Sequence, residues 1–145
     1  MDIQELYSKI IMEHHKAPRG TEAIDNYTHR AISKNTSCGD EVALKLRRGP
    51  RGTIQAIQQQ SEGCIICRAS ASMLAEQVQQ LNFEQALFLI REAEALIHGQ
   101  TDVEPAEITH EAPFKALAHL RDFPTRHRCG LLAWETLEKI LLEEG

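Results

Sequence analysis

The hydrophobic pattern of the chain changes its period at Gly63. Between residues 42 and 47, Val42, Leu44 and Leu46 alternate with small or charged residues, which is typical of a strand with one buried face. After Gly63 the apolar residues recur at the spacing of a helix. A run of strands followed by helices predicts an α+β fold, with a small antiparallel three-stranded sheet packed against several helices.

Turn and capping residues divide the chain into its expected elements. Strands are predicted at residues 28–34, 42–47 and 53–59, with a turn at residues 49–52 between the last two. A first helix begins at Asp2, which with Glu5 resembles a capping box, and Pro18 and Gly20 stop it. Further helices are expected from Gly63 to about residue 81, from Asn82 to Gly99, around Leu117 up to Pro124, and at residues 126–142. Residues 101–113 are interpreted as a loop.

Size and charge limit the classes of function. The chain has 145 residues, and we expect one domain over residues 1–145. Its net charge of -5 argues against nucleic acid or an anionic membrane as partner, since either needs a basic face. No apolar run approaches the roughly 20 residues of a membrane helix, and the first residues lack a signal-peptide pattern. A cytoplasmic location, in which cysteines stay reduced, is therefore expected.

The four cysteines lie at three places, Cys38, Cys64 with Cys67, and Cys129. Cys64 and Cys129 fall at the starts of predicted helices, where the partial positive charge favours thiolate. Three thiolates and one further donor suit zinc or the iron of an iron–sulfur cluster, and Asp40 can be the fourth ligand. From spacing alone, a shared site and scattered core thiols are equally open, and a purely structural zinc is a third interpretation.

Histidines offer no comparable pattern. His14 and His15 end the first helix, where cations are favoured by the helix dipole, and we prefer this role to metal binding. The other histidines outside the last cysteine motif are interpreted as surface or hydrogen-bonded residues. These are His29, His98, His110 and His119.

Three motifs together resemble one known family. They are Cys38-Gly39-Asp40, Glu62-Gly63-Cys64 followed by residues 69–73, and Arg128-Cys129 followed by Leu132-Ala133-Trp134. The family is the iron–sulfur cluster assembly family of IscU, SufU and the N-terminal domain of NifU. The chain is most similar to the SufU branch, because the segment between Cys64 and Cys129 is long and contains Phe123-Pro124. IscU-type proteins have histidine directly before the third cysteine, whereas here Arg128 occupies that position and His127 precedes it.

The resemblance implies a zinc site formed by Cys38, Asp40, Cys64 and Cys129. It also implies a sulfurtransferase that accepts persulfide sulfur from a PLP-dependent, SufS-like cysteine desulfurase. Similarity to SufU points to Cys38 as the acceptor, and similarity to IscU to Cys129. Arg128 is either a donor that stabilises the charge of the site or a solvated surface residue.

Two alternatives accompany this interpretation. The chain could instead be a scaffold that assembles a [2Fe–2S] or [4Fe–4S] cluster and passes it to apo-proteins or a downstream scaffold. It could also be an adaptor in which zinc is only structural. Cys67 departs from the family pattern, and we interpret it first as a buried bystander, with a sulfur relay or replacement of Asp40 as the other possibilities.

Overall fold

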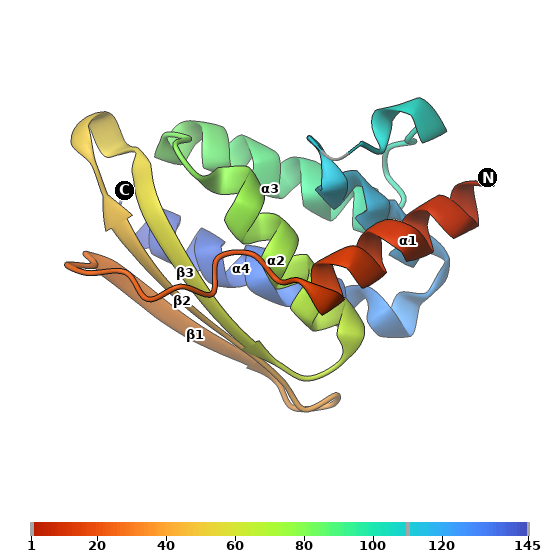
Figure 1. The fold of residues 1–145 in the computed structure, drawn as a ribbon, viewed down its shortest axis with the longest axis horizontal. Coiled ribbons are helices and arrows are strands. Elements are labelled where there is room, and N and C mark those ends of the chain that lie inside the picture. The colour runs from red at the N-terminus through yellow and green to blue at the C-terminus, as the bar shows by residue number, and fades with distance from the viewer. Residues whose placement is uncertain (1, 110, 145) are drawn as a thin grey trace.

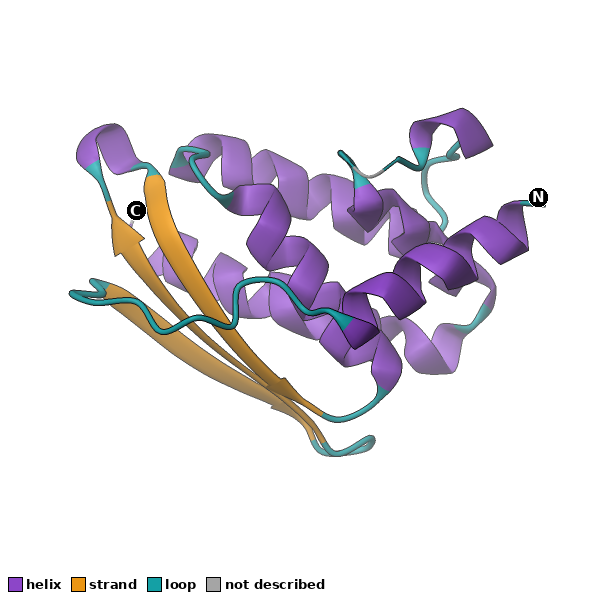
Figure 2. Ribbon diagram, viewed as in Figure 1, coloured by secondary structure: helices purple, strands orange, loops and turns teal. Residues whose placement is uncertain are grey.

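The chain folds into a three-stranded sheet with helices on one side of it (Figures 1 and 2). The structure is a computed structural model that describes residues 2–109 and 111–144, so the interpretation of His110 lies outside the described residues. The α-helices and strands are α1 (Ile3–Lys16), β1 (His29–Asn35), β2 (Asp40–Arg48), β3 (Ile54–Glu62), α2 (Ile65–Val78), α3 (Phe83–Ile97) and α4 (His127–Glu144). Short 3-10 segments are η1 (Pro50–Gly52), η2 (Pro105–Glu107), η3 (Pro113–Asp122) and η4 (Pro124–Arg126).

The sheet is antiparallel, in the order β1-β2-β3. Val42, Leu44 and Leu46 point inward and are almost fully buried, as the alternating pattern predicts. The α+β prediction is therefore confirmed. β1 and β3 each begin one residue later than predicted and end later, whereas β2 extends beyond its prediction at both ends, because ladder hydrogen bonds continue into polar residues. The predicted strand began only at Val42, but Asp40 is already the first residue of β2 and lies opposite Asn35.

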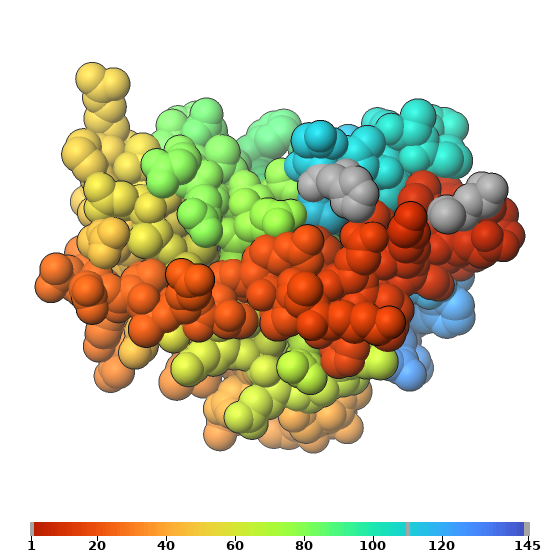
Figure 3. All heavy atoms as spheres, viewed as in Figure 1, coloured from red at the N-terminus to blue at the C-terminus, as the bar shows by residue number. Residues whose placement is uncertain are grey.

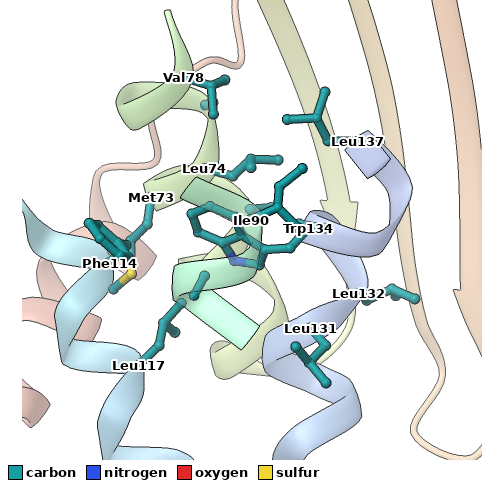
Figure 4. Packing of buried hydrophobic residues seen from close by; sticks show 14 of the residues in the cluster. Met73, Leu74, Val78, Ile90, Phe114, Leu117, Leu131, Leu132, Trp134 and Leu137 are labelled. Atoms are coloured by element: carbon teal, nitrogen blue, oxygen red, sulfur yellow. The ribbon is translucent and has the colours of Figure 1, made fainter. Parts of the chain in front are cut away.

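The helices bury one shared core against this sheet. α4 packs on β1 and β2, and α2 packs on β3, α1 and α4. Figure 4 shows Trp134 of α4 and Met73 of α2 among the buried side chains, and the Phe114 and Trp134 ring centroids are 6.0 Å apart. Among the described residues, no helix is long and apolar enough to cross a membrane.

Capping residues fix the helix starts as the sequence suggests. The Asp2 carboxylate accepts a hydrogen bond from the Glu5 N–H at 2.8 Å, and Asn82 forms a reciprocal capping box with Gln85. The helix expected around Leu117 is instead the 3-10 segment η3, which starts at Pro113 and continues to Asp122. The predicted loop before it contains the short turn η2.

The segment after α1 crosses the molecule and covers the edge of β3 (Figure 3). The Gln59 N–H donates to the Gly20 carbonyl at 2.7 Å, so the edge strand has a backbone partner there. His14 secures this segment: it is buried, and its Nδ1 lies 2.7 Å from Ser72 Oγ, which also accepts the Arg19 N–H. His14 thus has a specific structural contact, whereas the sequence predicted only a favourable interaction with the helix dipole.

Candidate metal centre

Three of the predicted ligands converge at the end of the sheet from which α2 begins. One ligand atom each from Cys38, Asp40 and Cys129 lies within 4.8 Å of the others. Cys38 comes from the β1–β2 hairpin, Asp40 from the start of β2, and Cys129 from the first turn of α4. Cys38 is exposed, whereas Asp40 and Cys129 are 2% and 1% exposed. The site therefore has one thiol open to solvent and two donors inside the protein.

Asp40 ties the hairpin to the turn that carries Cys64. Its Oδ1 accepts a hydrogen bond from the Cys64 N–H at 3.0 Å. Gly63, just before, has φ of 126°, and a Cβ there would overlap the Asp40 carboxylate and backbone. Only glycine allows both the positive φ and this close approach. The close approach of Asp40 therefore explains why glycine precedes Cys64 in the sequence.

Cys64 is the N-cap of α2. Its Sγ accepts a hydrogen bond from the Cys67 N–H at 3.4 Å, at the positive end of the helix. Cys64 also interacts with Cys129, since it contributes to the raised pKa of the Cys129 thiol. The fourth predicted donor therefore lies close to the cluster, but it is not one of the three donors that lie within 4.8 Å of one another.

The electrostatics of Cys129 fit a site that holds a cation. Burial raises the pKa of the Cys129 thiol well above its usual range, and hydrogen bonds with Asp40, Cys64 and Cys38 raise it further. Such crowding of acidic groups disfavours further negative charge until a positive ion offsets it. Three sulfurs and one carboxylate suit a tetrahedral zinc ion or cluster iron, so the donor set fits either group.

A buried serine positions the helix that carries Cys129. Ser70 Oγ donates to the Gly130 carbonyl at 2.6 Å and accepts the Trp134 Nε1–H at 2.9 Å. Gly130 itself packs against Leu120, with no room for a side chain. The sequence pattern did not indicate Ser70 as a residue of the site. Hydroxyl groups within an otherwise apolar helix were the signal that could have indicated this link.

Cys67 does not join the cluster of three donors. It is 1% exposed and belongs to the hydrophobic core. Burial first, and then the charges of Asp40, Cys64 and Cys38, raise the pKa of its thiol to about 12, while Arg68 acts in the opposite direction. This position agrees with a buried bystander, which stays a prediction.

Arg128 is directed toward its own helix. Its Nη1 lies 2.9 and 3.1 Å from the two carboxylate oxygens of Glu135, and its side chain is 55% exposed. This geometry agrees with the surface alternative. Its predicted role beside the thiols stays untested, because no described contact joins its guanidinium to them.

The histidines lie outside the cluster of donors. His127 and His98 have ring centroids 5.2 Å apart, and His119 packs between Tyr7 and Phe123. Burial lowers the pKa of His119 below its ordinary value. Within the described residues, none of these rings reaches the three-donor group.

A small α+β protein whose thiols and carboxylate converge from separate loops has the donor set of a domain that binds a metal ion or handles sulfur. Comparison with known families makes this specific. The chain belongs to the NifU-like N terminal domain family, whose model matches residues 6–142. The family resemblance seen in the sequence is thereby confirmed.

Relatives from two branches are equally similar. The chain is 28% identical to the iron-sulfur cluster assembly scaffold protein IscU of Thermotoga maritima, covering 97% of this chain and 96% of that protein. It is also 28% identical to the zinc-dependent sulfurtransferase SufU of Bacillus subtilis, covering 99% and 95%.

Solved structures agree on the fold. The crystal structure of FiSufU from Fervidobacterium islandicum AW-1 superimposes with a TM-score of 0.80 at 29% identity, covering 94% of this chain and 97% of that one. A NifU-like N-terminal protein from Brucella abortus has a TM-score of 0.80 at 21% identity, with coverage of 98% and 97%. At that identity the second match supports the fold alone.

Proposed function

We propose that this chain is an iron–sulfur cluster assembly protein that binds zinc and accepts persulfide sulfur from a cysteine desulfurase. The observation that carries the proposal is the convergence of Cys38, Asp40 and Cys129 within 4.8 Å, with Cys64 beside them. The name of the Bacillus subtilis relative, a zinc-dependent sulfurtransferase, supports the same activity.

The different exposure of the thiols favours Cys38 as the acceptor. A sulfur donor on another protein must reach the attacking thiol, and Cys38 is exposed while Cys129 is buried. Cys129, which similarity to IscU favours, remains the alternative acceptor. Zinc, when bound, would keep the site thiols deprotonated near neutral pH.

The transfer is a thiol exchange. The Cys38 thiolate attacks the terminal sulfur of the desulfurase persulfide, and a new S–S bond forms at Cys38. The S–S bond of the donor breaks, and the desulfurase cysteine leaves as a thiolate. The product is a persulfide on Cys38, ready for a downstream scaffold or apo-protein.

Metal analysis and mass spectrometry test this proposal together. Purified protein should contain about one zinc per chain, and incubation with cysteine and a PLP-dependent, SufS-like desulfurase should add one sulfur atom. Cys38→Ala should lose that mass shift. Cys67→Ser is the matched control and should retain both zinc and sulfur acceptance. Normal acceptance by Cys38→Ala would contradict the role of Cys38 and direct attention to Cys129.

The second candidate function is a scaffold for a [2Fe–2S] or [4Fe–4S] cluster. It is favoured by the similarity to the IscU scaffold of Thermotoga maritima and by a donor set that also suits iron. Anaerobic reconstitution with iron and sulfide distinguishes it. A visible absorption band that moves to an acceptor apo-protein would support the scaffold role, and no cluster formation would exclude it.

A further inference from the structure

A metal site of three thiolates and one carboxylate carries excess negative charge, about -2 with a divalent ion by simple addition. A cation near the site would offset it. Arg128, the cation predicted from sequence, is already bound to Glu135 through two contacts. The charge of the site therefore needs a different partner.

Arg68 is placed for this role by the register of α2. Its N–H donates to the Cys64 carbonyl at 3.1 Å, so it lies one helical turn after Cys64. Residues four apart share a helix face, and helical side chains lean toward the N-terminus, which here is the end that carries Cys64. The charge of Arg68 acts on the neighbouring Cys67 thiol.

The surroundings of Arg68 leave its charge available. The side chain is half-buried, and over residues 2–109 and 111–144 its guanidinium has no hydrogen bond or ion pair. A half-buried cation costs desolvation free energy that an opposite charge would offset. The acidic groups whose charges act on the Cys67 thiol together with Arg68 are Asp40, Cys64 and Cys38.

We propose that Arg68 is a positioning residue that attracts anionic sulfur to the thiol cluster and stabilises the negatively charged site. Its preferred ligand is an anionic sulfur donor, such as a persulfide anion, rather than a neutral one. This inference rests on the proposed function for its biological meaning. The electrostatic preference itself does not require sulfur acceptance.

The test compares two small disulfides on metal-free protein with its thiols reduced. Dithiobis(nitrobenzoate) is dianionic and dithiodipyridine is neutral, and each reacts by thiolate attack that releases an aromatic thiol. The measured quantity is the rate constant for the dianionic reagent divided by the rate constant for the neutral reagent, both taken for the fastest-reacting thiol. Arg68→Met should lower this ratio about three- to tenfold, and Arg68→Lys should retain most of it. The loss should shrink at about 1 M salt, which screens charge but would not repair a packing defect.

Two controls make the result specific. Arg30→Met removes one exposed cation from β1 and should leave the ratio unchanged. Arg126→Met tests the exposed arginine beside Phe123, just before α4. An unchanged ratio in Arg68→Met, or an equal fall in Arg30→Met or Arg126→Met, would overturn the inference.

Zinc competition with a chromophoric chelator provides a second readout. Arg68→Met should weaken zinc binding about tenfold, again with rescue by Arg68→Lys. Should the wild-type protein accept no persulfide sulfur while the reagent ratio still falls, the proposed function fails and the role of Arg68 stands. If the persulfide mass shift is normal and the ratio is unchanged, the role of Arg68 fails and the proposed function stands.

Discussion

At the scale of single residues, the site depends on a few positions whose backbone and solvation are unusual. Gly63 lets the turn before α2 pass against Asp40, and Cys64 then caps the helix. Asp40 and Cys129 are almost fully buried although both can ionise. Burying ionisable groups together is unfavourable without a partner of opposite charge. These residues therefore lower local stability while they hold the donors in a fixed arrangement.

Gly63→Ala is expected to damage both stability and the site. The new Cβ would overlap Asp40 and force an alanine to adopt φ near 126°. We expect the free energy of unfolding to fall by about 2–4 kcal/mol, with weaker zinc binding. Gly39→Ala is the matched control: its φ is also positive, at 69°, but its Cβ would meet nothing within 4 Å. It should lose only about 1–2 kcal/mol. Urea unfolding measures both, and equal losses would argue against the contact with Asp40.

The buried Cys67 thiol should cause the free energy of unfolding of the metal-free protein to decrease at alkaline pH. Its folded pKa is raised to about 12, so the unfolded chain loses the thiol proton first as pH rises. The stabilisation is complete below the unfolded pKa of about 8.5 and disappears as pH approaches 12. Cys67→Ala should therefore show a smaller decline in unfolding free energy between about pH 8.5 and 10.5 than the wild-type protein. Parallel pH profiles in urea unfolding would contradict this.

At the scale of elements, the link between α2 and α4 decides where Cys129 lies. Ser70 joins the two helices through the Gly130 carbonyl and the Trp134 indole, next to the cysteine. Its hydroxyl is fully buried, so neither partner can turn to water when it is removed. This helix–helix contact therefore couples the packing of the core to the position of Cys129.

Ser70→Ala should destabilise the protein by about 1–3 kcal/mol, because two buried polar groups lose a partner. Zinc affinity should fall as well, since the start of α4 becomes less fixed. Ser8→Ala, on the exposed face of α1, makes the same chemical change with an expected effect within about 0.5 kcal/mol. Thermal unfolding and zinc competition measure the pair. A stable Ser70→Ala protein with unchanged zinc affinity would show that the link is dispensable.

At the scale of the whole molecule, the hydrophobic core and the candidate metal centre occupy different parts of the fold. The buried residues extend from α1 through the sheet to α4, whereas the ligand atoms gather at one end. A chain of this size buries enough apolar surface to fold without a metal. A bound ion would then add stability by linking the β1–β2 hairpin, the turn before α2 and the start of α4.

Removal of zinc by a chelator should therefore lower Tm without unfolding the domain. Far-UV circular dichroism at about 25 °C should keep its helical signal, and the unfolding transition should shift down by several degrees. Readding zinc should restore it. Loss of the helical signal on chelation would instead favour the adaptor hypothesis, in which zinc is only structural.

The periodic parts of the chain were accessible from sequence. Val42, Leu44 and Leu46 alternate because one face of β2 is buried, and Asp2 and Asn82 mark helix starts because their side chains accept backbone N–H groups. The 3-10 geometry of η3 was not predictable, since the repeat of Leu117 and Leu120 fits either kind of helix. The motifs around Cys38, Cys64 and Cys129 indicated the candidate site, while their convergence was only an expectation.

The fold class, the helix caps and the set of candidate ligands could be inferred from the chain alone, because they depend on residue type and local spacing. Three features depend on the packing of the folded chain: Cys38 is exposed while Cys129 is buried, Arg128 pairs with Glu135, and Ser70 holds the start of α4. Exposure and side-chain pairing are set by contacts between residues far apart in the chain. Such contacts leave no periodic signal, and so they follow only from the packed molecule.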